Sequence, residues 1–217
     1  MNTFSTLQKI AVWIIPLIFA ITVHEAAHGY VANYYGDPTA KNQGRLSLNP
    51  IKHIDLVGTI IVPGILLLLG GFIFGWAKPV PVNWRQLRNP RLHMALVALA
   101  GPLANLLMAM GWAFITKMGM FINSNSHYGV VLMAISSAGI IINLILMVLN
   151  LIPIPPLDGS RVLSSILSPQ MARWYNIIEP FGLLILLALI FTGLLSRMMA
   201  PLIFGALHSL RFLFGLY

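Results

Sequence analysis

Hydrophobic residues are concentrated in six segments of the chain, at residues 8–32, 56–75, 91–118, 129–152, 175–196 and 199–217. Most of these segments approach or exceed the roughly 20 residues that an α-helix needs to cross a bilayer. Polar or proline- and glycine-rich connections separate them. The pattern therefore predicts an all-α polytopic membrane protein with about five to six transmembrane helices, folded as a single membrane-embedded domain over residues 1–217.

Two connections have the pattern of extended chain rather than of helix. Residues 44–49 alternate polar and apolar side chains, and residues 78–82 contain Pro79 and Pro81, which are incompatible with a helix interior. We expect short strands near the cytoplasmic surface at both places. Such strands could pair with an unwound substrate by strand addition, or they could cover the core or pair with each other.

The segment 56–75 is interrupted by prolines and glycines and is short for a tilted span, so a re-entrant segment is predicted there. With this re-entry, most basic residues lie on one side of the membrane, and Arg211 lies near that side. Lys9, Lys117 and Arg197 lie opposite. The basic residues that share one side are Lys41, Arg45, Lys52, Lys78, Arg85, Arg88, Arg91, Arg161 and Arg173. The positive-inside rule then assigns the basic side to the cytoplasm.

Composition agrees with a membrane protein, since 58% of residues are hydrophobic, 8% are charged and the mean hydropathy is +0.85. The net charge of +8 is spread between apolar segments, which indicates membrane orientation rather than binding to nucleic acid. A secretory signal peptide is a weaker interpretation of the first segment, because further membrane segments follow it. The absence of cysteine excludes a disulfide framework, a thiolate zinc site and a cysteine nucleophile.

His24 and His28 lie four residues apart near the end of the first apolar segment, and Glu25 lies between them. Two histidines at this spacing share one face of a helix and can bind zinc, while the glutamate is placed to take a proton from the attacking water. The alternative is a histidine pair that hydrogen bonds between packed helices. We favour zinc because a carboxylate costs about 2.5 to 3.5 kcal/mol in mid-membrane, and a neighbouring dication offsets that cost.

A catalytic zinc ion usually has three protein ligands, so this motif lacks one. Asp158 is the best placed of the remaining acidic residues, although an Asp-Gly pair after prolines is also an ordinary surface turn. If the segment 56–75 re-enters, the first helix and the helix at 129–152 run in the same direction and both end on the cytoplasmic side. Asp158 would then lie close to His24 and His28.

Three motifs together resemble those of the site-2 protease family of intramembrane zinc metalloproteases, most closely its compact forms without sensory domains. They are His24-Glu25-Ala26-Ala27-His28, Gly101-Pro102-Leu103-Ala104-Asn105 and the segment from Asn150 to Gly159. The resemblance implies that Asp158 is the third ligand of one Zn²⁺ per chain and that Glu25 is the general base. It places Asn150 near the scissile carbonyl or the substrate backbone, although a helix cap or an interhelical hydrogen bond explains Asn150 equally well. Asn105 is interpreted as a packing residue.

By this resemblance the expected activity is hydrolysis of peptide bonds within or near transmembrane segments of other membrane proteins, known as regulated intramembrane proteolysis. We expect an integral protein of a prokaryotic plasma membrane with its active site toward the cytoplasm. Di-iron lipid hydroxylases also use histidine boxes, but they need many clustered histidines, and this chain has six, of which two share a box. The non-enzyme alternative is a metal-binding membrane protein such as a transporter or a regulator.

Overall fold

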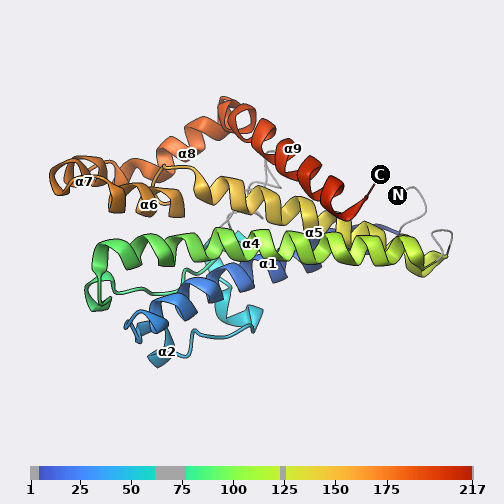
Figure 1. Ribbon diagram of the computed structural model, residues 1–217, viewed down its shortest axis with the longest axis horizontal. Helices are drawn as coiled ribbons and strands as arrows, with labels where there is room; N and C mark the ends of the chain where they lie inside the picture. Colours follow the sequence, from blue (N-terminus) through green and yellow to red (C-terminus); the bar gives the residue numbers. More distant parts are fainter. Residues whose placement is uncertain (1–4, 62–76, 123–125, 217) are drawn as a thin grey trace.

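The computed structural model describes residues 5–61, 77–122 and 126–216, and helices dominate these ranges. Three long helices, α1 (Thr6–Tyr34), α4 (Pro90–Phe121) and α5 (His127–Leu151), lie side by side and form a central bundle (Figure 1). Four stretches are long and apolar enough to cross a membrane: Thr6–Tyr34, Pro90–Phe121, Tyr128–Leu151 and Pro169–Phe191. The chain is therefore an all-helical integral membrane protein, and the expected count of five to six spans is not confirmed.

Each long helix begins at a polar side chain that accepts a hydrogen bond from a free backbone N–H. Ser5 and Gln8 form a capping box at α1, Asn89 caps α4 just before Pro90, and Ser126 caps α5. Small residues then allow the helices to approach closely. A Cβ atom on Gly139 of α5 would lie 2.5 Å from the ring of Trp112 on α4.

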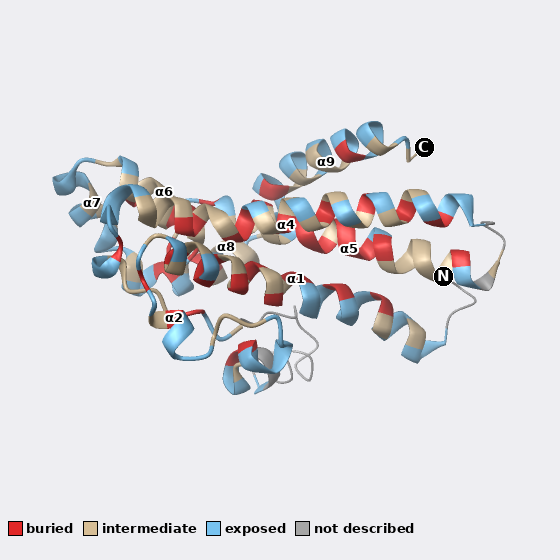
Figure 2. Cartoon of the chain, turned by 60° about the horizontal axis from the view of Figure 1, so that its bottom comes forward, coloured by how far each residue is buried: buried red, intermediate tan, exposed pale blue. Residues whose placement is uncertain are grey.

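Burial follows the faces on which the helices meet. In Figure 2 the buried residues of α1, α4 and α5 face the interior of the bundle, and the outward faces are exposed. Large apolar side chains such as Ile14, Leu107 and Ile145 lie on these exposed faces, at 46%, 68% and 38% exposure. In water such a surface would be unfavourable, whereas lipid tails solvate it.

The structure gives α1 and α5 the same direction, and α4 runs the opposite way against both (Figure 1). This is the relation between the first helix and the helix at 129–152 that the charge pattern predicts. As a result, the ends of α1 and α5 lie at the same end of the bundle. The short helix α2 (Thr39–Asn42) lies at this end too.

The C-terminal elements are α6 (Asp158–Ile166), α7 (Pro169–Asn176), the 3₁₀ turn Glu179–Phe181, α8 (Gly182–Phe191) and α9 (Leu194–Phe214). Helices α8 and α9 meet at Gly193, whose φ of 69° is favourable for glycine. Together they run from the end of the bundle that carries α7 to the end that carries the C-terminus (Figures 1 and 2).

This course corrects the expected position of Arg211, which does not lie near the main group of basic residues. Arg211 belongs to the last turn of α9, and Lys117 Nζ of α4 donates a hydrogen bond to the carbonyl of Gly215, at 3.0 Å. The end of α9 therefore lies beside the end of α4. The bend at Gly193 directs the chain onward rather than back.

The two connections expected as strands form no strand in the described part of the chain. Residues 44–49 and 78–82 are irregular, and Arg45 joins them by donating from Nη2 to the carbonyls of Lys78 and Pro79. Prolines lack the N–H group that a ladder requires, which explains why side chains make the connection. The segment expected to re-enter begins with a π-helical turn, Leu56–Ile61, and its residues 62–75 lie outside the described residues.

Asp37 joins the end of α1 to the segment that precedes α4. Its carboxylate is fully buried and accepts hydrogen bonds from Thr39 N at 2.9 Å, Thr39 Oγ1 at 2.5 Å and Asn83 N at 2.6 Å. Three donors compensate for the burial of the charge. Asp37 therefore fixes the position of the segment around Asn83 relative to α1.

We expect Asp37→Ala to lower the free energy of unfolding by about 1–3 kcal/mol, because it leaves the partly buried N–H groups of Thr39 and Asn83 without their acceptor. Thermal unfolding of the detergent-solubilised protein measures this change. Asn49→Ala removes an exposed side chain that caps the turn Pro50–His53 and should have a smaller effect. Equal unfolding midpoints for Asp37→Ala and the unmodified protein would contradict the assigned role.

Candidate metal centre

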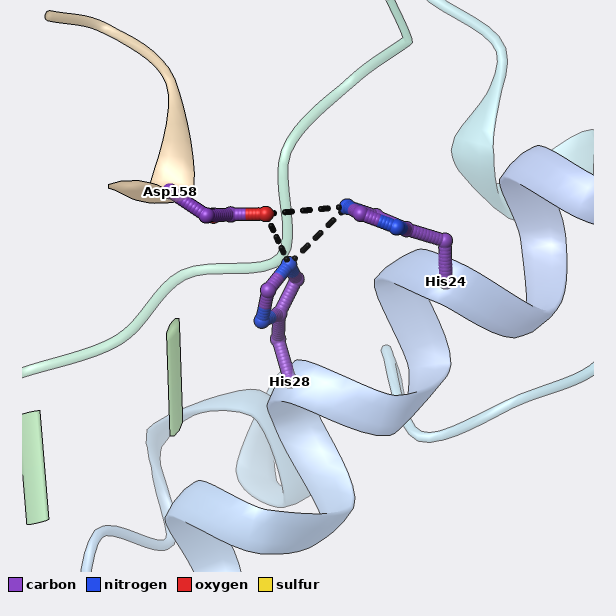
Figure 3. Close-up of side chains that lie close together, drawn as sticks. All are labelled: His24, His28 and Asp158. Atoms are coloured by element: carbon purple, nitrogen blue, oxygen red, sulfur yellow. Dashed lines mark hydrogen bonds and ion pairs between the residues drawn. The ribbon is translucent and has the colours of Figure 1, made fainter. Parts of the chain in front are cut away.

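Three polar side chains converge where α1, α4 and α6 meet (Figure 3). Helix α1 presents His24 and His28 from successive turns, and both are buried, at 7% and 9% exposure. Asp158 is the first residue of α6, after the loop that leaves α5. The Nε2 atoms of the histidines are 3.1 Å apart, and Asp158 Oδ2 lies 3.2 Å from Nε2 of His24 and 3.3 Å from Nε2 of His28.

Hydrogen bonds on the far side of each imidazole determine where its proton lies. His28 Nδ1 is 2.7 Å from the carbonyl oxygen of Val97, which can only accept, so Nδ1 carries the hydrogen. His24 Nδ1 is 2.5 Å from Asn105 Oδ1, which likewise accepts. In both neutral rings Nε2 is therefore unprotonated, and its lone pair is available at the point of convergence.

The carboxylate of Asp158 adds negative charge to the same point. Its Oδ2 atom is buried and has no hydrogen-bond donor among the described residues. Three electron-pair donors thus face one another without an intervening hydrogen, an arrangement that a cation stabilises.

The spacing of the three atoms fits a single small cation. Zinc binds histidine nitrogen and carboxylate oxygen at about 2.0–2.2 Å, so ligands on a tetrahedron are roughly 3.4 Å apart. The observed separations of 3.1–3.3 Å are close to that value. Within the described residues, His24, His28 and Asp158 are the group of histidine and acidic side chains that could hold a metal ion. Two nitrogens and one oxygen suit zinc.

Two glycines provide the space that this arrangement needs. A Cβ atom on Gly101 of α4 would lie 2.5 Å from His24 Cε1 and 2.5 Å from His28 Nε2, so α4 passes directly against both imidazoles. A Cβ atom on Gly159 would lie 2.3 Å from the carbonyl oxygen of Leu151. Gly159 therefore lets the chain turn sharply after α5 and bring Asp158 toward the histidines.

Glu25 is half-buried on α1 beside the histidines. Its Oε2 atom accepts a hydrogen bond of 2.8 Å from the backbone N–H of Val80, in the irregular segment 78–82. This contact fixes one carboxylate oxygen of Glu25. The base candidate is therefore positioned by a segment distant in the sequence.

Asn150 is partly buried near the end of α5, and its side-chain amide donates a hydrogen bond to the carbonyl of Leu146 in its own helix. This contact does not involve His24, His28 or Asp158. Asn105, interpreted from the sequence as a packing residue, contacts His24 directly. Asn143 was not singled out from the sequence, yet it contacts Asn105. The available signal was an amide in the middle of an apolar helix, where an unpaired polar group is costly.

The fold and the site together describe a helical membrane protein in which two histidines and one carboxylate could hold a metal ion. The model of peptidase family M50 matches residues 115–189, a range that includes Asn150 and Asp158. Over 211 residues the chain is 41% identical to a Bacillus subtilis protein named "Putative zinc metalloprotease YwhC". The alignment covers 93% of this chain and 90% of that relative.

Two mycobacterial proteins, both named "Putative zinc metalloprotease Rip2", are also similar. The Mycolicibacterium smegmatis protein is 29% identical over 207 residues, which are 94% of this chain and 76% of the relative. The Mycobacterium tuberculosis protein is 31% identical over 182 residues, 83% of this chain and 65% of the relative. No solved structure matches the chain. The chain belongs to peptidase family M50, the site-2 protease family, and is an intramembrane zinc metalloprotease.

We expect Gly101→Ala to abolish tight zinc binding, because the added methyl group would occupy the space between α4 and the two imidazoles. The measurement is the zinc content of purified protein after gel filtration. Gly111→Ala is the matched control, since a Cβ atom at Gly111 of the same helix meets no atom within 4 Å. Equal zinc content in both variants would show that the imidazoles do not need the space at Gly101.

Proposed function

We propose that His24, His28 and Asp158 bind one Zn²⁺ per chain and that this ion is the catalytic metal. The observation that carries the proposal is the convergence of three electron-pair donors whose separations fit one ion. Two neutral histidines, Asp158 and the nearby Glu25 balance the charge of a dication. Such a balance favours a metal site within a membrane protein, where an isolated charge is costly.

We further propose that Glu25 is the general base. When bound, zinc would polarise the scissile carbonyl and lower the pKa of a water molecule to about 7. The Glu25 carboxylate takes a proton from the attacking water and later passes it to the nitrogen of the leaving amine. The N–H of Val80 orients the carboxylate for this transfer. Asn150 is proposed to assist at the scissile carbonyl or the substrate backbone.

The proposed substrates are transmembrane segments of other proteins, which are cut within or near the bilayer. A helix buries its peptide bonds in its own hydrogen-bond ladder, so a substrate must unwind before attack. The irregular segments 44–49 and 78–82 are candidates for pairing with the unwound strand. Support comes from the contact between Val80 and Glu25, which brings the second of these segments to the base.

We also propose that the site opens toward the cytoplasm of a prokaryotic cell, with the enzyme in the plasma membrane. Exposed basic residues accompany the ends of α1 and α5 near the site, including Lys41, Arg85 and Arg88. A cytoplasmic excess of lysine and arginine is typical of membrane proteins. The similar proteins come from bacteria, which supports the prokaryotic assignment.

Glu25→Gln is expected to abolish proteolysis while zinc remains bound, since the amide cannot take a proton and the three ligands are unchanged. General base catalysis typically contributes about 10²–10⁴-fold to a rate, so we expect a loss of at least this size. Cleavage of a model transmembrane substrate in detergent or liposomes measures the activity, and elemental analysis measures zinc. Undiminished cleavage by Glu25→Gln would exclude Glu25 as the base.

Asp158→Asn should reduce the bound zinc from about one ion per chain to nearly none after dialysis against a weak chelator, because a neutral amide is a poor ligand for zinc. Metal analysis of the purified protein provides the measurement. Glu179→Gln is a control that alters a carboxylate paired with Arg161, away from the three ligands. Two iron ions per chain would instead favour the hydroxylase class, and zinc without turnover would favour a transporter or regulator.

A further inference from the structure

A chain of side-chain amides connects the metal centre to the middle of α5. Asn105 Nδ2 donates to Asn143 Oδ1 at 2.9 Å, and Asn143 Nδ2 donates to the backbone carbonyl of Gly139 at 2.8 Å. Both amides are fully buried. The first member of the chain, Asn105 Oδ1, lies 2.5 Å from His24 Nδ1. This series of hydrogen bonds therefore runs from a backbone oxygen on α5 to His24 on α1.

The carbonyl of Gly139, at one end of this series of hydrogen bonds, determines the orientation of both amides. The carbonyl oxygen of Gly139 can only accept, so Asn143 must direct its NH₂ group toward it. The oxygen of Asn143 then faces Asn105, which must direct its own NH₂ group there. This leaves the oxygen of Asn105 toward His24. Rotation of either amide by 180° would place two donors or two acceptors against each other.

We propose that Asn143 is a positioning residue for the metal ligand His24 and acts through Asn105. By holding the Asn105 oxygen toward Nδ1, Asn143 selects the tautomer of His24 whose Nε2 lone pair faces the metal. The proposal rests on the proposed role of His24 as a zinc ligand. Asn143 itself touches none of the three ligands, so its effect is on the orientation and protonation pattern of the site.

Removal of the Asn143 amide frees Asn105 to rotate. Its NH₂ group can then donate to His24 Nδ1, which requires the hydrogen of the ring to move to Nε2. A hydrogen on Nε2 points into the space between the ligands and competes with the metal. Loss of an outer hydrogen-bond partner typically weakens metal binding by about 10–100-fold, and we expect a change of this size.

The test compares the zinc affinity of three variants of the full chain in detergent, by competition with a chromophoric chelator. Asn143→Leu removes the amide and keeps the same number and branching of side-chain heavy atoms. Asn143→Asp retains both hydrogen bonds, because a buried neutral carboxylic acid donates to the carbonyl of Gly139 and accepts from Asn105. Ser136→Ala is the matched control. Ser136 is as fully buried as Asn143 and accepts a hydrogen bond of 2.8 Å from Thr116, so it also joins α4 and α5.

We expect Asn143→Leu to bind zinc about 10–100-fold more weakly, with Asn143→Asp and Ser136→Ala close to the unmodified protein. The absorption spectrum of bound Co²⁺ should change in Asn143→Leu alone, because the orientation of one ligand changes. Unaltered affinity in Asn143→Leu, or equal losses in Asn143→Leu and Asn143→Asp, would overturn the proposal. If Asn143→Leu does not fold, Asn143→Ala is measured with the same criteria.

The experiment separates this proposal from the proposed catalytic metal. If the unmodified protein binds no zinc, the assignment of the three ligands fails. If the unmodified protein, Ser136→Ala and Asn143→Leu all bind zinc equally tightly, the result agrees with the three assigned ligands and contradicts the proposed role of Asn143.

Discussion

The interaction on which the rest of the structure depends is the approach of three electron-pair donors within a buried part of the bundle. His24 Nε2, His28 Nε2 and Asp158 Oδ2 lie 3.1–3.3 Å apart, and none of the described residues donates a hydrogen bond to Asp158 Oδ2. Without a cation these atoms repel one another. The surrounding helices must therefore hold them in place, and each helix does so through a specific contact rather than through general apolar packing.

Helix α4 makes the largest contribution to this restraint. It supplies the carbonyl of Val97 to His28 and the amide of Asn105 to His24, and Gly101 between them lets the helix pass against both rings. In water, solvent would satisfy these polar groups in many orientations. Within a membrane each must find a protein partner, so the chain of amides continues until it ends at the backbone of Gly139.

The sequence allowed much of the site to be predicted because ligand chemistry is local. The spacing of His24 and His28 follows from helix periodicity, and the parallel course of α1 and α5 follows from charge counting. Arg211 was misplaced because hydropathy measures the extent of an apolar segment and carries no information on direction after a bend. The hydrogen-bond partners of Asn105 and Asn143 depend on which helix faces contact each other. The periodicity of the sequence does not specify that pairing. The strand expected at residues 78–82 did not form because Pro79 and Pro81 lack the N–H groups that a ladder requires.

The irregular segment 78–82 links Glu25, the proposed base, to the rest of the fold. Val80 donates to Glu25, while Asp37 holds Asn83 three residues later and Arg45 holds the carbonyls just before it. The orientation of Glu25 therefore depends on a short stretch of backbone that is fixed at both ends. In the proposed function, a substrate strand that pairs with this stretch would contact the residues that orient Glu25. Recognition of an unwound substrate and proton transfer would then involve one continuous piece of chain. Side chains, rather than a strand ladder, hold the backbone of that piece in place.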